Sequence, residues 1–559
     1  MNAFFPENRQ GLSGSGIPRE VDVLIVGGGP VGSALAVDLG IRGISAVTIE
    51  RNGELLAKNV RARSFTARTM EHVRRWGVDQ KLRDSATVPA EWRSKGFVIK
   101  TSLAGHVLLH PDPPRKDAWR ALTANSNFGV PQYVLTAVLR ARALELGNPV
   151  FPGWTVTELA QRDEGVSAVI EKTMSGDVRT IRARYVVGAD GGRSVVRQTL
   201  GIPRTETPVR GIYFNVAVRL PGIFETIGIE PHGLFLLFNP QAQHVFGPFD
   251  TERWGFSAGP YPEGTRPEDV DFIREARNRV GTDIPVEIDT VSSFTVQKRI
   301  ADRFRQGHFL LAGDAAHLFP PFLGQNLNTG IEDVANLGWK LEAVIKGWGG
   351  DSLLDSYHEE RHFIAHRVAD AALARGEELD RNRDFVRAHP VSDDDLSPHA
   401  EETRAVLTQY LVEREPRPFD GVALDHRYDH SPIIISDGSA PVPWDPKTYT
   451  PSTRPGHRAP HLFLSEGEAL YDKFGLGFGL VDLSGEDEDG AVAPLLRAAS
   501  ASGLPLTRVG NLHPGLADLY PARYTLVRPD QYVAWRGDTI PGDFNRIVDV
   551  ARGFESLDA

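Results

Sequence analysis

The sequence predicts an α/β fold in three parts: a Rossmann-like nucleotide-binding domain, a β-rich domain inserted into it, and a smaller α/β domain at the C-terminal end. Three observations support this prediction. The chain has 559 residues, too many for a single hydrophobic core. A strand, a glycine-rich turn and a helical pattern follow one another at residues 21–42, as in a βαβ unit. Residues 211–262 contain alternating apolar and polar segments, a pattern typical of antiparallel strands.

The βαβ unit is the best-defined part of the prediction. Residues 21–26 (VDVLIV) form a mostly apolar run that fits a strand buried on both faces of a parallel sheet. Residues 27–32 (GGGPVG) predict a tight turn, residues 33–42 a helix, and residues 46–50 (AVTIE) the second strand. Two further helices are expected at residues 61–76 and 133–146.

The remaining elements follow from changes of pattern along the chain. They are strands at residues 212–218, 233–238 and 309–312, a helix at 331–345, and a long helix from 352 to about 380. Six prolines predict that residues 429–458 are a linker, and residues 459–554 then have strand–helix–strand texture. The predicted parts are a flexible leader (1–20), the nucleotide-binding domain (21–92, 130–205 and 290–400), the β-rich domain (93–129 and 206–289), a helix and proline-rich linker (401–458) and the C-terminal domain (459–559).

The composition excludes several classes of protein. Asp and Glu number 73 against 62 Lys and Arg, so an acidic chain of net charge −11 has no electrostatic reason to bind nucleic acid or an anionic membrane. No stretch reaches about 18 consecutive apolar residues, and the N-terminal residues lack the apolar core of a signal peptide, so we expect a cytoplasmic protein. There is no cysteine, so disulfides and thiolate chemistry are excluded and redox chemistry would need a bound cofactor. The histidines show no metal-ligand spacing, and we expect no metal site.

The first motif predicts a dinucleotide site. It reads Gly27-x-Gly29-x-x-Gly32, with Pro30 and Val31 between the last two glycines, after a strand and before a helix. The glycines allow a tight turn, close approach of the backbone to a pyrophosphate, and close packing of the helix on the strand. Glu50 follows 18 residues after the last glycine, at the end of the second strand, where its carboxylate can accept hydrogen bonds from ribose hydroxyls. The motif alone does not separate FAD from NAD.

Two later motifs are more specific. Residues 185–197 (YVVGADGGRSVVR) contain Asp190 and Gly191 after a strand. Residues 309–341 contain a buried strand, then Asp314, a Pro-Pro-Phe elbow, Gly324, and a helix expected to begin near Asn328. The start of such a helix can place backbone amides against an electron-rich ring carbonyl.

Together these motifs resemble the class A, single-component FAD-dependent aromatic monooxygenases, and the resemblance spans the whole chain. Residues 61–62 and 68–71 are similar to the family's PRA…RTME segment, and Gln132 matches the glutamine that opens its next helix. Residues 455–461 and 528–536 resemble the phenol and polyketide hydroxylases, which carry a third, thioredoxin-like domain. Without cysteine that domain cannot exchange thiols, so we expect a structural role.

The resemblance implies roles for individual residues. The implied FAD contacts are Gly27, Gly29, Pro30, Val31 and Gly32 at the pyrophosphate, Glu50 and Arg51 at the adenosine side, Arg61 and Gln132 at the ribityl and flavin side, Asp314 at the ribityl or pyrophosphate region, and Pro321, Gly324, Leu327 and Asn328 along the isoalloxazine. Asp190 and Gly191 are implied in FAD and reduced-nicotinamide binding. Pro321, Arg63 and Tyr213 are the candidate catalytic residues. The family's usual Gly-Gln-Gly is replaced here by Gly324-Gln325-Asn326, which bears on how far the flavin can move.

Other interpretations of the same residues stay open. Arg61, Arg63 and Arg68 fit a solvated helix face as well as a site, Tyr213 fits an ordinary core strand, and His317 fits a structural turn better than a base.

The resemblance also implies a reaction. NADH or NADPH would reduce FAD, O₂ would give a flavin C4a-hydroperoxide, and a small electron-rich aromatic substrate bound in the β-rich domain would be hydroxylated. Baeyer–Villiger or epoxidising chemistry on the same fold is an alternative, as are a flavoprotein without oxygen insertion and a ligand-binding regulator. The family further implies a homodimer. The sequence identifies neither the substrate nor the choice between NADH and NADPH.

Overall fold

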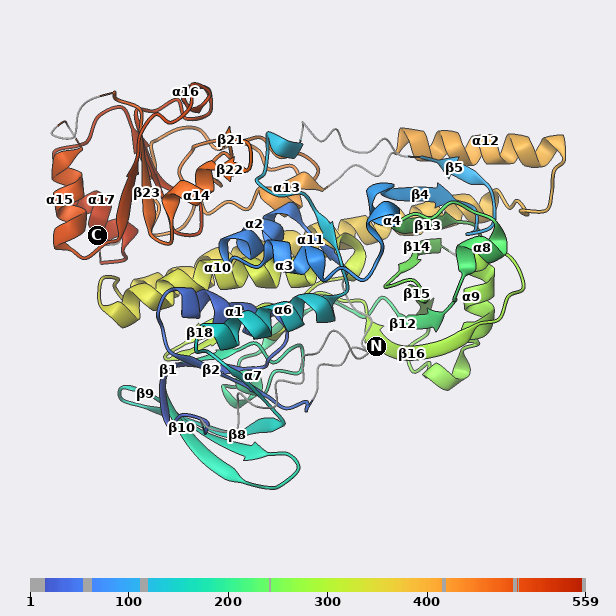
Figure 1. Cartoon of the computed structure of the whole chain (residues 1–559), viewed down its shortest axis with the longest axis horizontal. Helices are drawn as coiled ribbons and strands as arrows, with labels where there is room; N and C mark the ends of the chain where they lie inside the picture. The colour runs from blue at the N-terminus through green and yellow to red at the C-terminus, as the bar shows by residue number, and fades with distance from the viewer. Residues whose placement is uncertain are drawn as a thin grey trace.

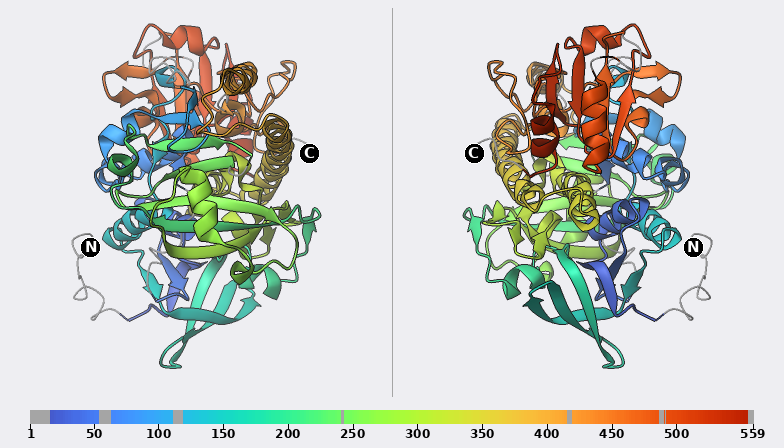
Figure 2. Two further views of the ribbon diagram at one scale, coloured as in Figure 1. Left: turned by 90° about the vertical axis from the view of Figure 1, so that its right-hand side faces the viewer. Right: turned by 90° about the vertical axis from the view of Figure 1, so that its left-hand side faces the viewer.

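The computed structural model describes residues 16–53, 63–110, 119–240, 243–414, 419–485, 490 and 492–554. Two long helices, α10 (Gln325–Lys346) and α11 (Ser352–Ala388), cross the middle of the molecule. The nucleotide-binding sheet lies on one side of them, the β-rich domain at one end, and the C-terminal domain at the other (Figure 1). The side views in Figure 2 show the C-terminal domain and the nucleotide-binding sheet at opposite edges of the molecule.

The nucleotide-binding domain is built on a sheet of order β18-β19-β10-β1-β2-β7, with β8 and β9 continuing from β10 as an antiparallel layer. Its central strand β1 (Glu20–Val26) pairs in parallel with β2 (Ala46–Glu50) and β10 (Val178–Gly188), and Val23, Leu24 and Ile25 are fully buried. This confirms the predicted βαβ unit. The other elements of this domain are α1 (Pro30–Ile41), α6 (Gln132–Glu145), β7 (Val150–Pro152), β8 (Trp154–Arg162), β9 (Gly165–Lys172), α7 (Val195–Thr199), β18 (Arg305–Gln306) and β19 (Phe309–Leu311).

The β-rich domain is a seven-stranded sheet of order β16-β12-β15-β14-β13-β4-β5. Its strands are β4 (Phe97–Lys100), β5 (Val107–Leu109), β12 (Ile212–Arg219), β13 (Leu234–Phe238), β14 (Gln243–Pro248), β15 (Arg253–Tyr261) and β16 (Glu287–Thr295). Side chains such as Phe214 and Trp254 form one core with helices α8 (Ile223–Ile227) and α9 (Phe272–Val280). The boundary predicted at residue 290 falls inside β16, because that strand pairs with β12 along its whole length.

The second helix of the chain is shorter than predicted. Helix α2 (Ala67–Arg75) begins at Ala67, where the side chain of Thr66 accepts a hydrogen bond from the amide of Thr69. The residues before it form β3 (Ser64–Phe65), which pairs with β6 (Phe128–Gly129). Small elements complete this part of the chain: α3 (Asp79–Asp84), α4 (Ala90–Ser94), β11 (Arg204–Glu206), β17 (Arg299–Ala301), β20 (His317–Leu318) and the single turns η1 (Pro267–Asp269), η2 (Gly313–Ala315) and η3 (Pro321–Leu323).

The C-terminal domain has a four-stranded sheet of order β24-β23-β25-β26. Strand β23 (Phe478–Asp482) is parallel to β24 (Leu506–Val509) and antiparallel to β25 (Tyr524–Val527), which forms a hairpin with β26 (Val533–Gly537). Helices α15 (Ala493–Ala501) and α17 (Phe544–Ala551) pack on one face of the sheet. The other face carries α14 (Leu470–Phe474) and α16 (Leu516–Leu519), and β21 (Phe463–Ser465) pairs with β22 (Glu468–Ala469) beside them. This is the expected thioredoxin-like arrangement.

The segment predicted as a proline-rich linker is a packed connection. It follows α12 (Pro398–Glu413) and α13 (Asp420–Leu424) and has neither helix nor strand from residue 429 to 458. Ile433, Ile434 and Arg458 are nevertheless buried, because the segment lies against α11 and the C-terminal sheet. In the described part of the chain, no helix combines the length and apolar character needed to span a bilayer.

Candidate active site

Of the glycines in this turn, Gly29 alone has room for a Cβ atom. A Cβ on Gly27, whose φ is +105°, would lie 2.4 Å from the carbonyl oxygen of Ala189, and one on Gly32 would lie 1.9 Å from that of Gly27. A Cβ on Gly29 would meet nothing within 4 Å. Gly27 therefore allows close packing against the turn that follows β10, and Gly32 allows close packing of α1 on Gly27. Gly29 faces open space at the N-terminus of α1, where backbone amides favour an anion.

Glu50 braces this turn. One carboxylate oxygen accepts the amide of Gly28 at 2.8 Å, and the other accepts the backbone and side-chain nitrogens of Asn52, both at 2.8 Å. Arg140, which the sequence reasoning missed, binds the carbonyl of the same residue: its Nε and a terminal nitrogen donate to the Gly28 oxygen at 3.0 and 2.6 Å. The spacing of two residues in the sequence could have identified Arg140. Gln132 and Arg140 are eight residues apart on one helix, so they lie toward the same side of it.

The second motif adds a half-buried carboxylate, that of Asp190. Asp190 accepts hydrogen bonds from the amides of Val195 and Val196 at the start of α7, at 2.6 and 3.3 Å. Burial raises the pKa of Asp190 above its ordinary value, although the hydrogen bonds with Ser194 and these amides oppose the rise. Asp190 and Gly191 both line the cavity described below.

The third motif forms the elbow at the start of α10. Helix α10 begins at Gln325, earlier than predicted, with Gly324 as its N-terminal cap at φ +65°. Asn326, the departure from the family's glycine, binds the elbow at two points: its side-chain oxygen accepts the amide of Phe319 at 2.7 Å, and its nitrogen donates to the Phe319 carbonyl at 2.9 Å. Asn328 lies behind the cavity wall, where its amide group contacts Thr69 at 2.7 Å and the Gly324 carbonyl at 2.7 Å.

His317 has the structural role expected of it. Its ring stacks on Phe319 with an interplanar angle of 2°, and Nε2 lies 2.7 Å from Asp333. The same carboxylate accepts the amide of Gly313 at 2.9 Å, and its other oxygen accepts from Arg361 at 2.8 Å. Burial opposes ionisation of Asp333, but His317 and Arg361 outweigh it and lower the pKa to about 2. A permanent negative charge therefore fixes the backbone beside Asp314.

One cavity of about 1510 Å³ joins the three motifs to the face of the β-rich sheet. The predicted site residues that line it are Gly27, Gly29, Pro30, Val31, Glu50, Arg51, Arg63, Gln132, Asp190, Gly191, Tyr213, Asp314, Pro321, Gly324 and Leu327. Gly32 and Asn328 do not line it, for the packing reasons given above. Arg61 lies outside the described residues. The space at Gly29, the carboxylate of Glu50 and the size of the cavity all fit FAD.

Arg63 lines the cavity where it meets the β-rich sheet. It donates to the carbonyls of Gly247 at 2.6 Å and Gly255 at 3.2 Å, and its guanidinium lies 4.8 Å from the centre of the Phe249 ring. Among the described residues no carboxylate lies within ion-pair distance, and burial lowers its pKa. Tyr213 is buried on β12, stacked on Phe294 and edge-on to Phe322 of the elbow.

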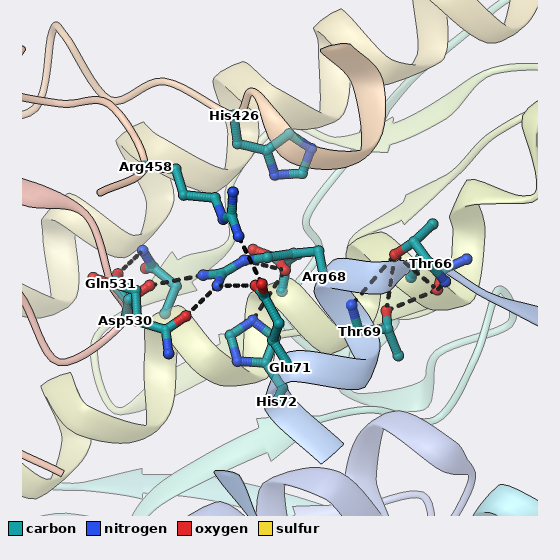
Figure 3. A network of polar contacts seen from close by, with 12 residues as sticks. Thr66, Arg68, Thr69, Glu71, His72, His426, Arg458, Asp530 and Gln531 are labelled. Atoms are coloured by element: carbon teal, nitrogen blue, oxygen red, sulfur yellow. Dashed lines mark hydrogen bonds and ion pairs between the residues drawn. The ribbon is translucent and has the colours of Figure 1, made fainter. Parts of the chain in front are cut away.

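A second arginine on the neighbouring helix lies in a different setting. Arg68 is only 2% exposed and contacts Glu71 and Glu332, each at 3.1 Å, so the solvated helix face considered for it is wrong. It also donates to the side chain of Gln531 and to the carbonyl of Asp530 at 2.8 Å (Figure 3). The C-terminal domain thus reaches α2 and α10 through buried polar contacts.

The fold and this cavity define a flavin-dependent oxidoreductase with its substrate bound between two domains. Comparison with known proteins makes the class more specific: residues 20–372 match the FAD binding domain family, and residues 452–552 match the aromatic-ring hydroxylase C-terminal domain. The chain belongs to the FAD-dependent aromatic-ring hydroxylases. It is an enzyme that uses FAD, NAD(P)H and O₂ to hydroxylate a small aromatic substrate.

Individual relatives cover nearly the whole chain. The tetracenomycin B2 monooxygenase-dioxygenase of Streptomyces olivaceus is 30% identical over 95% of this chain and 97% of its own. The 4-methyl-5-nitrocatechol 5-monooxygenase of a Burkholderia species is 31% identical over 94% and 95%. Among solved structures, RebC with bound 7-carboxy-K252c matches with a TM-score of 0.84 and 31% identity, over 96% of this chain and all of that one.

Proposed function

We propose that this enzyme hydroxylates a polycyclic phenol, bound as its phenolate between the elbow and the β-rich sheet. The observation that carries the proposal is the size of this cavity, about 1510 Å³. Pockets for one drug-sized ligand measure roughly 300–1,000 Å³, so this cavity has room for FAD and a second large molecule. A single-ring phenol would leave much of it filled with water.

Arg63 supports the anionic form of the substrate. A partly buried cation whose partners among the described residues are carbonyl oxygens and an aromatic face favours a negative charge placed beside it. Arg63 would therefore lower the pKa of a phenol hydroxyl at this position, and a phenolate ring is the stronger nucleophile. Tyr213, whose own pKa is raised by burial, would stay protonated and could donate a hydrogen bond from its hydroxyl.

The residues proposed to bind the cofactor are those of the three motifs, and of the neighbouring helix α6, that line the cavity. We propose that Gly29, Glu50, Gln132, Arg140, Asp190 and Asp314 hold FAD, with Pro321, Gly324 and Leu327 along its ring. When bound, FAD supplies the redox chemistry, taking hydride from NAD(P)H and activating O₂. Pro321 and its neighbours would keep water from the reacting atoms, while the clamp of Asn326 on Phe319 holds that wall in place.

A substrate panel tests this function. We expect hydroxyanthraquinones and other fused phenols to stimulate NAD(P)H oxidation more than phenol or catechol does, with little H₂O₂ and with one atom of ¹⁸O₂ in the product. A ring-opened product would instead favour Baeyer–Villiger chemistry, and label-free product would exclude oxygen insertion. If no fused phenol outperforms the single rings, the proposed substrate class is wrong.

Two expectations of the family resemblance also remain proposals. We propose that the enzyme is a homodimer located in the cytoplasm. Light scattering of the purified protein tests the first, and cell fractionation tests the second.

A further inference from the structure

The far end of the cavity is built by a part of the chain that neither family match covers. The matches end at residue 372 and resume at residue 452. Between them, the last turns of α11 and the end of α12 contribute six residues to the cavity wall: Arg375, Leu379, Asn382, Tyr410, Leu411 and Arg414. Figure 1 shows α12 over the β4–β5 end of the β-rich sheet, at the opposite end of the molecule from the C-terminal domain. We call these six residues the distal wall.

The distal wall is a packed structure. Leu407, Tyr410 and Leu411 of α12 share a small hydrophobic core with strands β4, β5 and β13, separate from the main core of that sheet. The Tyr410 ring stacks on Phe385 of α11 with centroids 3.7 Å apart, and its hydroxyl donates to the side-chain oxygen of Asn382 at 2.9 Å. Because α12 is tied to both the sheet and α11, it sets a fixed length for the cavity.

The polar groups of this wall are mostly donors. Arg375 pairs with Glu378 at 2.6 Å and Arg414 with Glu413 at 3.5 Å, but neither glutamate lines the cavity. The side-chain oxygen of Asn382 is used by Tyr410, which leaves its NH₂ group as the part available to a ligand. The wall therefore combines two arginines and an asparagine, whose guanidinium and amide groups are hydrogen-bond donors, with the apolar Leu379 and Leu411.

We infer that the distal wall is the specificity-determining end of the site, and that it recognises a hydrogen-bond-accepting oxygen, carboxylate or carbonyl, on the end of the substrate remote from the flavin. The inference rests on the proposed function, because it assumes that a fused ring system reaches from the elbow to α12. The apolar residues would then limit ring length, and the donors would select the end group. Both consequences can be measured by binding alone.

Ring length is tested by filling the wall. The probes are phenol and 1,8-dihydroxyanthraquinone, titrated into oxidised holoenzyme while the flavin absorbance is followed. We expect Leu411→Trp to raise the Kd of the three-ring probe at least tenfold and that of phenol less than twofold. The matched control is Val406→Trp, on the exposed side of the same helix, which should change neither. Equal effects of Leu411→Trp on both probes, no effect on either, or failure of the three-ring probe to bind the wild type would overturn the inference.

The end group is tested with the 3-carboxylate of the same anthraquinone. A hydrogen bond to a charged group contributes about 1.5–3 kcal/mol, so Arg375→Gln should weaken binding of the carboxylate probe about tenfold or more. A matching loss for the parent quinone would assign the site to a carbonyl oxygen, and a loss confined to the carboxylate would assign it to an acid. Arg381→Gln, on an exposed position of α11, is the control. An unchanged Kd for both probes in Arg375→Gln would exclude the donor role.

These binding measurements can refute the inference about the distal wall separately from the proposed function. They need neither NAD(P)H nor O₂, so a wall that discriminates probes in an enzyme that never hydroxylates them would leave the inference standing and refute the proposed reaction. Conversely, hydroxylation of fused phenols with no effect of Leu411→Trp or Arg375→Gln would confirm the reaction and refute the wall.

Discussion

Arg68 and Arg63 lie five residues apart and have opposite surroundings. Arg68 is enclosed by carboxylates: Glu71 and Glu332 contact it directly, and Glu71 in turn accepts Arg458 at 2.7 Å. Arg63 meets carbonyl oxygens and an aromatic ring at the edge of the cavity. The carboxylates raise the pKa of Arg68 in spite of its burial, whereas burial lowers the pKa of Arg63.

The difference separates structure from function. At the domain junction Arg68 and Arg458 have carboxylate partners within the chain, and these contacts help to fix the C-terminal domain on α2 and α10 (Figure 3). In the cavity, Arg63 has no carboxylate partner among the described residues, so an anionic substrate can pair with it. A buried pair is costly to break because the surviving charge has no solvent, but an unpaired charge beside a cavity can be removed with less loss of stability. Each prediction below tests this contrast.

The largest effect is expected at the junction. Glu71→Gln keeps the shape of the side chain but leaves Arg68 and Arg458 without their shared anion, so the free energy of unfolding should fall by about 3–5 kcal/mol. Denaturant unfolding followed by circular dichroism measures this loss. Asp472→Asn is the control: it breaks the Arg74 pair of the same interface, whose side chains are 27% and 38% exposed, and should cost less than about 1 kcal/mol. Equal losses in the two variants would remove the distinction between the regions.

The cavity should respond in the opposite way. Arg63→Met is expected to lower kcat/KM about 10²–10³-fold, as for loss of one group that stabilises developing negative charge, with a small change in stability. Arg63→Lys should recover part of the activity. Arg75→Met is the matched control, because Arg75 is also an arginine bonded to carbonyl oxygens, those of Pro529 and Gly475, but it does not line the cavity. Steady-state kinetics on a fused phenol would contradict the assignment if Arg63→Met and Arg75→Met were equally active.

The contrast also marks what the sequence could and could not predict. The glycine turn, Glu50, Asp190 and the elbow are contiguous motifs, and each could be located because local backbone geometry dictates its residues.

The junction was beyond such reasoning. Its polar side chains come from segments up to 463 residues apart, as in the contact of Arg68 with Gln531, and one sequence does not show which side chains meet. Glu360 and Arg361 have the sequence pattern of a solvated face of α11, yet both are fully buried against the C-terminal hairpin and the connecting segment. Arg140 and the distal wall were missed because neither belongs to a motif.

The junction should also confer a dependence on pH. Burial and the charge of Arg361 lower the pKa of His426 to about 3, whereas a histidine in the unfolded chain titrates near its usual 6.5. As the pH falls from 6.5 toward 3, the unfolded state binds a proton that the folded state refuses, so the free energy of unfolding decreases, by at most about 1.4 kcal/mol per pH unit from this site. Unfolding free energies at pH 7, 6 and 5 should show a shallower decline in His426→Gln. An identical decline would show that His426 is not the group responsible.

The smallest effect is expected at the elbow that forms part of the cavity wall. Substitutions of Asn326 test whether the position of the elbow is held by this residue's own hydrogen bonds or by the more distant buried network. Asn326 makes two hydrogen bonds to the backbone of Phe319, and each contributes about 1 kcal/mol or less. Asn326→Gly, which restores the family's usual residue, should therefore reduce stability by about 1–2 kcal/mol and raise the fraction of NAD(P)H oxidation that ends as H₂O₂. Asn326→Asp keeps the acceptor and loses the donor, so its H₂O₂ fraction should lie between those of the glycine variant and the wild type. If all three proteins couple equally well, the elbow is held by the packing of His317 on Phe319 and by the charge of Asp333, and the rigidity of the cavity derives from the buried network.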